Sequence, residues 1–450
     1  MQQSGGLLRV GVSAEATCIF CRRQKMQTNP VARTNKLLRK GAYALRIGIL
    51  TYHRSINYGA VTQCYTLANR LQRDFPNAQV EVIDYAPQWR IDSYKPTLKN
   101  FIFKGVSRGN GRKLNAKIVL SKLAELIAHP GHYCQIKARY AAFQRSLAQL
   151  PLSKEAYRQS DTASFRAAVR GKYDLIVVGS DCVWNWTTVP LPSPYYLSGD
   201  FGAVKASFAA SVGTDDYAKL SERERQELRE AIDDFRYVGV RDSSSEYVVQ
   251  GVCPGKPFFH NCDPTTLLDP AELEPYRRRA REKLIRHKID PDKPIVCVMG
   301  NEKLGKLARA IFCGRAQLVG VYVPNRYCDV FLPDLEALEW AALFGLCRLT
   351  LTTFFHGTML SLVNRMPVLS FDYLPETERQ HTKLHELYDR LGLQKMYYRG
   401  QRDYAGDDLK AIEAAALDLF EHPPTAEIAA ALEKEAESYD SLKAFIRSLE

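Results

Sequence analysis

The residues best suited to chemistry lie in the segment 349–373, which reads LTLTTFFHGTMLSLVNRMPVLSFDY. An apolar, β-branched run gives way to the turn Phe355-His356-Gly357. A helical apolar stretch at 358–364 and a second strand-like run follow. In such a unit the turn lies at the carboxyl end of a strand, where open parallel sheets bind ligands. Gly357 lets the backbone approach a ligand, and the N–H groups of the next helix favour an anion. We therefore predict that His356 faces a ligand; a buried histidine at a strand end is the alternative.

A second candidate is Arg241, which ends a predicted strand at 237–242. A guanidinium can hold a carboxylate or a phosphate through two hydrogen bonds. The alternative is an ion pair at the surface with Asp242.

Two further predicted strand ends carry polar residues, in the sequences NYGA at 57–60 and GSDCVWN at 179–185. The first precedes a helix whose free N–H groups favour an anion, and the second places a tryptophan where it could stack on a sugar ring. An ordinary turn and a core tryptophan are the alternatives. The candidates for the acceptor side of a cleft are Asn57, Tyr58, Ser180, Asp181 and Trp184.

The elements that would position these residues alternate between strand and helix. Strands are predicted at 46–53, 80–85, 173–181, 205–212 and 237–242. A basic, mostly helical region at 95–150, interrupted by a glycine-rich connection at 105–111, separates the second from the third. A capping box, Ser221 to Glu224, starts a charged helix. Proline, glycine and asparagine at 253–264 indicate a domain boundary.

The second half repeats the alternation, with strands at 294–299 and 316–323 and helices at 271–287, 304–313 and 334–345 before the histidine segment. This pattern predicts a second parallel sheet covered by helices. The predicted domains are a basic, disordered extension at 1–44, an acceptor-side α/β domain at 45–260, a donor-side α/β domain at 261–395, and C-terminal helices at 396–450 that pack back on the junction.

Length and composition agree with this organisation. The 450 residues exceed what one core usually holds, and 46% hydrophobic with 25% charged residues is typical of a globular protein. No apolar run approaches the roughly 20 residues of a membrane span. The net charge is +12, of which residues 1–44 supply +7, so the rest suits an anionic small substrate or a phospholipid surface as well as nucleic acid.

The eleven cysteines are an odd number and are scattered, which favours free thiols in a reducing cytoplasm over a disulfide framework. Cys18 and Cys21 form one C-x-x-C, but no second pair follows at zinc-finger spacing, so no metal site is predicted.

Six separated motifs, in this order, resemble the polysaccharide pyruvyl transferase family: RIGILTYHRSINYGAVTQCYTL, YDLIVVGSDCVWN, KASFAASVG, YVGVRD, CDPTTLL and LTTFFHG. The resemblance covers residues 45–393. It implies two Rossmann-like domains facing a cleft, similar to the B-type glycosyltransferase fold. It also implies transfer of the pyruvyl group of phosphoenolpyruvate to sugar hydroxyls of a cell-envelope or exopolysaccharide precursor, as a ketal, without a metal or nicotinamide cofactor.

By the same resemblance, His356 corresponds to the family's catalytic histidine, and Arg241 corresponds to its donor-binding arginine, beside Phe355 and Gly357. The implied partners are phosphoenolpyruvate and a saccharide acceptor, which could be lipid-linked. Nucleic acid is not implied, and membrane contact is at most peripheral, at the inner face of the membrane.

Two positions depart from the family pattern. Phe354 stands where a serine is usual, and Cys182 stands where glutamine is usual. The first is expected to reshape the pocket floor, and the second removes an amide that could contact an acceptor.

The chemistry also fits the residues directly, because a histidine with a reference pKa of about 6.5 can donate or accept a proton near neutral pH. Two other functions stay open. A nucleotide-sugar-dependent glycosyltransferase would share the two-domain layout, and a non-catalytic binding protein could dock through its basic extension on membrane or nucleic acid.

Overall fold

The computed structural model describes residues 44–103, 120, 121, 124, 130–213, 217–373, 381–400 and 407–450. The predicted basic extension up to residue 43, with its C-x-x-C, and the glycine-rich segment 105–111 lie outside the described residues. Both sheets belong to one compact unit, Ala44–Ser448.

The first sheet has seven strands in the order β3-β2-β1-β4-β5-β6-β7, and every neighbouring pair is parallel. Its interior strand β1 is apolar and buried after Arg46, as strands covered on both faces must be, and Ile47 pairs with both Val80 and Leu175. The strands are β1 (Arg46–Leu50), β2 (Gln79–Tyr85), β3 (Leu152–Tyr157), β4 (Leu175–Val178), β5 (Val204–Ala210), β6 (Tyr237–Val240) and β7 (Phe259–His260).

The second sheet has six parallel strands in the order β10-β9-β8-β11-β12-β13. They are β8 (Ile295–Met299), β9 (Gln317–Val321), β10 (Val330–Leu332), β11 (Leu349–Thr352), β12 (Val368–Asp372) and β13 (Tyr397–Arg399). Two parallel sheets with helices confirm the predicted α/β class. The sequence did not predict β3, β7, β10 and β13, which are the outermost strands of the two sheets.

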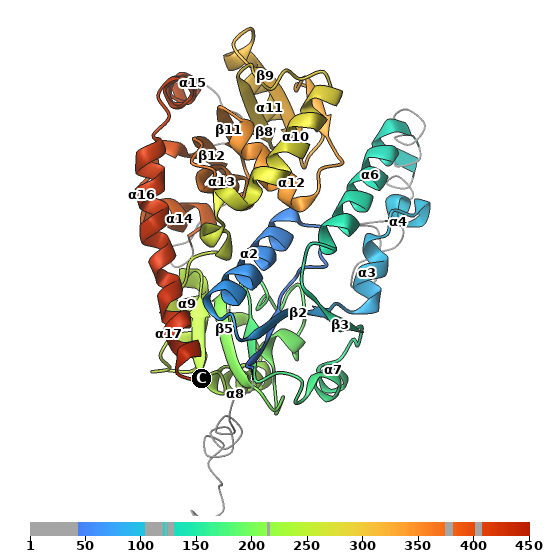
Figure 1. Ribbon diagram of the computed structural model, residues 1–450, viewed down its shortest axis with the longest axis vertical. Coiled ribbons are helices and arrows are strands. Elements are labelled where there is room, and N and C mark those ends of the chain that lie inside the picture. The colour runs from blue at the N-terminus through green and yellow to red at the C-terminus, as the bar shows by residue number, and fades with distance from the viewer. Residues whose placement is uncertain are drawn as a thin grey trace, which may run out of the picture. The chain divides into compact units, whose positions relative to one another are not determined.

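Helices surround the sheets (Figure 1). Ser221 and Glu224 form the predicted capping box at the start of α8. The helices of eight or more residues are α2 (Tyr58–Asp74), α6 (Pro130–Leu147), α7 (Thr162–Val169), α8 (Glu222–Asp233), α9 (Ser243–Val252), α10 (Glu274–Arg286), α11 (Glu302–Phe312), α13 (Phe355–Val363), α14 (Lys383–Leu391), α15 (Asp407–Glu421), α16 (Thr425–Ala436) and α17 (Asp440–Arg447). The shorter ones are α3 (Gln88–Tyr94), α4 (Leu98–Phe103) and α12 (Ala337–Leu343).

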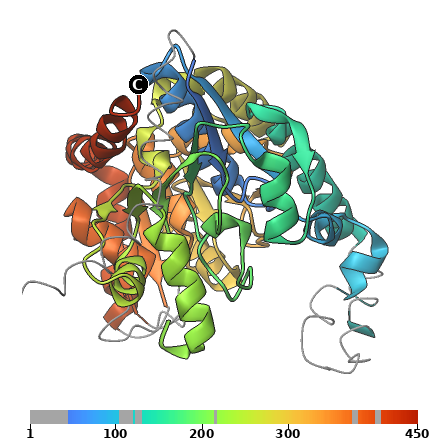
Figure 2. The same cartoon turned by 90° about the horizontal axis from the view of Figure 1, so that it is seen from below.

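Helix α6 connects the two halves on one side. The Ser146 hydroxyl accepts a hydrogen bond from the backbone N–H of Ala337 at 2.8 Å, and Arg145 forms an ion pair with Glu336 at 2.7 Å. In Figure 2, α6, α3 and α4, drawn in teal and cyan, lie on the side opposite to the red C-terminal helices.

The C-terminal helices connect the halves on the other side (Figure 1). Helix α16 contacts α13 and α14, and α17 contacts β6. The Asn261 side chain donates a hydrogen bond to the Ser438 carbonyl at 3.1 Å, and the Tyr237 and Ser441 hydroxyls lie 2.7 Å apart. Within the described ranges, no helix is long and apolar enough to cross a membrane.

Candidate active site

A cavity of about 190 Å³ lies where the carboxyl ends of strands from both sheets meet. We call it the His356 cavity. This is the edge at which parallel sheets bind ligands. Its lining residues are Asn57, Asp181, Arg241, Met299, Tyr322, Trp340, Phe354, Phe355, His356 and Lys383.

His356 lies in the first turn of α13, which begins at Phe355, three residues before the predicted start at Thr358. Its ring packs against the start of α2, because a Cβ atom added to Gly59 would lie only 2.1 Å from it. The Nδ1 atom is buried and has no hydrogen-bond partner among the described residues. Burial lowers the pKa of His356, while Asp263 and Asp181 act in the opposite direction. The imidazole is therefore neutral at neutral pH.

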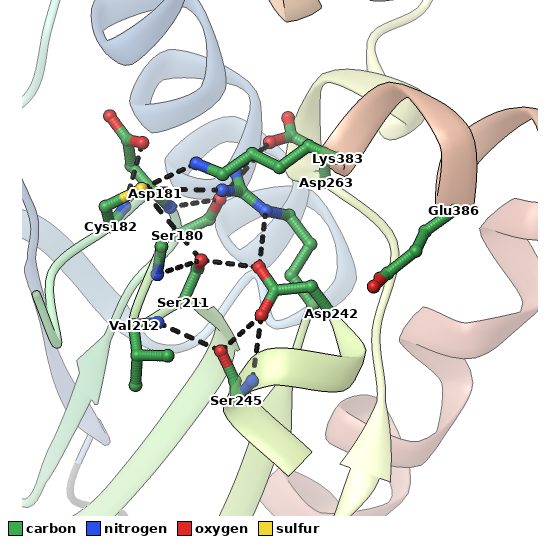
Figure 3. Close-up of polar contacts among 12 residues, drawn as sticks. Ser180, Asp181, Cys182, Ser211, Val212, Asp242, Ser245, Asp263, Lys383 and Glu386 are labelled. Atoms are coloured by element: carbon green, nitrogen blue, oxygen red, sulfur yellow. Dashed lines mark hydrogen bonds and ion pairs between the residues drawn. The ribbon is translucent and has the colours of Figure 1, made fainter. Parts of the chain in front are cut away.

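Arg241 follows β6 directly and is only 3% exposed. Its Nη1 donates to Oδ2 of Asp263 at 3.0 Å, and its guanidinium carbon lies 5.2 Å from the centre of the Phe355 ring. Asp242 is farther, at 3.9 Å, and instead accepts hydrogen bonds from Ser211 and Ser245 (Figure 3). The arginine thus belongs to a buried ion pair and not to a surface pair.

The carboxylate that binds Arg241 belongs to Asp263. It is 2% exposed, and its Oδ1 accepts a hydrogen bond from the Thr265 N–H at 3.0 Å. Burial alone would raise the pKa of Asp263, but His356 and Arg241 hold it below the usual value. The carboxylate is therefore ionised and keeps the guanidinium oriented.

Lys383 extends from the start of α14 towards Cys182, beside Asp181 (Figure 3). Its Nζ lies 2.6 Å from the Cys182 Sγ, and no carboxylate of the described residues is within ion-pair distance of it. Burial would raise the pKa of Asp181, but Lys383 and Arg241 lower it overall. The cavity thus carries two cations from different elements, and only one of them is bound to a buried carboxylate.

Of the residues predicted for the site, Asn57, Asp181, Arg241, Phe355 and His356 line the cavity. Asn57 also caps α2, because its side chain accepts from the Gly59 N–H at 3.0 Å. Gly357 is buried and is not among the lining residues. A Cβ atom added to it would lie 2.6 Å from Thr352 and 2.8 Å from Met299.

Tyr58, Ser180 and Trp184 do not line the cavity. Trp184 is 0% exposed, and its indole N–H donates to the Tyr195 carbonyl at 3.2 Å. Tyr58 is buried beside Trp340, with ring centres 5.8 Å apart. Ser180 is 0% exposed and donates to Asp263 at 3.4 Å.

Several lining residues, and Asp263 beside them, were not predicted as site residues from the sequence. Asp263 lies in the motif CDPTTLL and could have been found there. Lys383 follows the segment 374–380, which is outside the described residues, and no local pattern marks it. Tyr322 and Trp340 come from the ends of two other elements, and only the fold brings them to His356.

Phe354, which departs from the family pattern, is the N-cap residue of α13. Its side chain makes no capping hydrogen bond, whereas a serine could accept one. Its ring packs edge-on against Tyr322, with ring centres 5.2 Å apart. The first turn of α13 therefore has no side-chain cap from this position. In the described part of the chain, no group of three or more His, Cys, Asp or Glu residues could hold a metal ion.

Several solved structures have a similar chain path. The UDP-GlcNAc 2-epimerase of Neisseria meningitidis is 10% identical, covers 90% of this chain and 100% of its own, and has a TM-score of 0.47. The ADP-heptose lipopolysaccharide heptosyltransferase II of Escherichia coli is 10% identical, covers 87% and 99%, and has a TM-score of 0.36. These likenesses are distant, and nothing about the substrate of this chain follows from them.

No curated protein matches the sequence significantly. Residues 57–375, well over half of the chain, match the family model described as polysaccharide pyruvyl transferase. The chain therefore belongs to the polysaccharide pyruvyl transferase family.

Proposed function

We propose that this protein is an enzyme that transfers the pyruvyl group of phosphoenolpyruvate to two hydroxyls of a saccharide, forming a ketal and inorganic phosphate. The family match supports polysaccharide modification. The observation that carries the choice of donor is the convergence of Arg241, Lys383 and the start of α13 on one small cavity.

The size of the His356 cavity favours a small donor. Sites for drug-sized ligands measure about 300–1,000 Å³, whereas this cavity measures about 190 Å³. Phosphoenolpyruvate has three carbons, one carboxylate and one phosphate. The guanidinium of Arg241, the ammonium of Lys383 and the uncapped helix start suit these two anionic groups.

The reaction balances without an oxidant or a reductant. The C3 methylene of phosphoenolpyruvate takes up a proton and becomes a methyl group, and the first sugar hydroxyl bonds to C2 and loses its proton. The bond from C2 to the phosphate oxygen then breaks, and phosphate leaves with the electron pair. A second hydroxyl bonds to C2 and closes the ketal. One of the two hydroxyl protons balances the proton taken up at C3, and the other leaves with phosphate.

In this reaction His356 binds the donor and accepts a proton from the attacking hydroxyl. A neutral imidazole is the form able to do so, and burial keeps the pKa of His356 below its ordinary value. Once protonated, the same ring can donate at C3. Arg241 holds the donor, and Asp263 orients Arg241.

The test is a product assay with the purified full chain. Phosphoenolpyruvate is incubated with a panel of methyl glycosides of glucose, galactose, mannose, N-acetylglucosamine and N-acetylmannosamine. The expected result is phosphate release together with a glycoside whose mass has increased by one pyruvyl ketal. Release of UDP from UDP-GlcNAc, with no phosphate from phosphoenolpyruvate, would contradict the proposal and support a glycosyltransferase.

A further inference from the structure

A second and larger cavity shares a lining residue with the first. It measures about 490 Å³ and is lined by residues of α3, α4 and α6 and of the turn between α3 and α4, together with Ile56 and Tyr322. Tyr322 also lines the His356 cavity, and Ile56 is next in sequence to Asn57, which lines that cavity too. Tyr322 and the turn before α2 therefore lie between the two cavities.

We propose that this larger cavity, named the aromatic pocket, binds the saccharide acceptor and presents its hydroxyls to the His356 cavity. The inference rests on the proposed function, because it assigns the second substrate of the same reaction. The volume lies within the about 300–1,000 Å³ range of sites that enclose most of a ligand.

The side chains that line the aromatic pocket suit a sugar ring. Aromatic rings from α3, α4 and α6 line the pocket, those of Tyr94, Phe101, Tyr133 and Tyr140 among them. A sugar has an apolar C–H face that packs on such rings and hydroxyl edges that need polar partners, which tyrosines offer beside their apolar bodies. Among the described residues that line the pocket there is no aspartate or glutamate, so it could also take a sugar that carries phosphate.

The pocket is held in shape by one contact within the first half and one across the two halves. The Tyr133 hydroxyl donates to the Pro96 carbonyl at 2.7 Å, which fixes α6 to the turn between α3 and α4. Arg139 donates to the Tyr322 carbonyl at 3.1 Å, and its guanidinium carbon lies 4.1 Å from the centre of the Tyr322 ring. A pocket built this way costs less ordering on binding.

Tyr322, which lies between the two cavities, is contacted by Phe354, the residue that departs from the family pattern. Phe354 packs on Tyr322 from the His356 side, and Arg139 packs on it from the aromatic pocket side. A serine at 354 would leave Tyr322 without this contact. Phe354 therefore shapes the passage through which an acceptor hydroxyl must reach the donor.

The experiment measures two bindings separately on the full chain. Saturation-transfer NMR follows the five methyl glycosides of the panel, and calorimetry follows phosphoenolpyruvate. The variants are Tyr140→Ala, which removes a ring from the pocket, and Ile136→Trp, which fills the pocket. The matched control is Tyr276→Ala on α10, because Tyr276 lines neither cavity.

We expect at least one glycoside to bind the unaltered protein, and both pocket variants to weaken its binding by about tenfold or more. Tyr140→Ala removes a stacking contact, and Ile136→Trp takes up the space that the ligand needs. The control should bind the glycoside normally, and phosphoenolpyruvate affinity should stay unchanged in all three variants. If no glycoside binds, or if both pocket variants bind like the unaltered protein, the pocket assignment is overturned. Failure of phosphoenolpyruvate to bind the unaltered protein would instead overturn the proposed donor, because glycoside binding is measured without it.

Discussion

Two clusters in this protein contain a histidine, a buried aspartate and two cations. They differ in whether the histidine nitrogens have hydrogen-bond partners and in whether the residues line a cavity of appreciable size. In the first, Asp84 binds Arg54 and Arg158, and His53 lies 3.3 Å from the same carboxylate. The second is the group of His356, Asp263, Arg241 and Lys383. The same residue types serve both, so residue type alone does not distinguish a structural cluster from a site.

In the Asp84 cluster both ring nitrogens of the histidine have polar partners. The two nitrogens of His53 lie 3.2 Å from the Thr51 carbonyl and 3.3 Å from Asp84, and His53 is 0% exposed. In the His356 cluster, Nδ1 of His356 is buried without a hydrogen-bond partner among the described residues, and His356 lines a cavity. An unpaired buried polar atom is costly, so a histidine nitrogen left unpaired at a cavity favours a site over a structural cluster.

Replacing each histidine by glutamine should separate the two clusters most clearly. His356→Gln is expected to lower kcat by about 10²–10⁴-fold, the usual range for loss of an acid–base group, with the melting temperature nearly unchanged. His53→Gln should lower the melting temperature and leave the kcat of the folded protein intact. Steady-state phosphate release and thermal unfolding measure both; equal losses of kcat would show that the two clusters do not differ in role.

Asp84→Asn should have the largest effect on stability. The change leaves Arg54 and Arg158 beside an amide in a buried site, which typically costs about 3–5 kcal/mol of the free energy of unfolding. Urea unfolding measures the loss. The fraction of the variant that remains folded should have a normal kcat. A lower kcat without a loss of stability would assign Asp84 to the active site.

Gly59→Ala should disturb the His356 cluster by steric contact alone. The new Cβ would lie 2.1 Å from the His356 ring and push it out of place, and a displacement of about 1 Å can cost about 10²-fold in rate. The matched control is Gly131→Ala, because nothing lies within 4 Å of a Cβ at that position. Comparable kcat values for the two variants would mean that the position of the His356 ring does not matter.

The smallest effect concerns titration. The pKa of both histidines lies below the ordinary value because both are buried. Phosphoenolpyruvate should raise the pKa of His356, because a nearby anion favours the imidazolium, and should leave the pKa of His53 unchanged. NMR of histidine-labelled protein measures this, with the two His→Gln variants for assignment. A shift of His53 alone would place the donor elsewhere.

The sequence predicted the centre of the fold better than its edges. Continuous apolar runs such as 175–178 identified central strands, because a strand covered on both faces must be apolar. The edge strand β3 reads LSKEAY, with three exposed residues, and β7 has only two residues, so neither has such a pattern. The start of α13 was placed too late because Phe355 and His356 were taken for the turn.

The candidate site was predictable only as far as local motifs reach. His356 and Arg241 each follow a strand within a motif, and parallel strands bring their carboxyl ends together. Lys383, Tyr322 and Trp340 come from separate elements and have no spacing in common with His356. Likewise, no pattern in the sequence shows that Trp184 fills the core and not the cleft, because both uses follow a strand end.

The proposed function requires the His356 cavity to hold an acidic three-carbon donor. Calorimetric titration of phosphoenolpyruvate into the full-length protein tests this, beside titration of UDP-GlcNAc and titration of phosphoenolpyruvate into the variant Lys383→Met. We expect phosphoenolpyruvate to bind, Lys383→Met to weaken this binding by about tenfold through loss of a charge-assisted contact, and UDP-GlcNAc not to bind. If UDP-GlcNAc binds and phosphoenolpyruvate does not, the His356 cavity is not a phosphoenolpyruvate site.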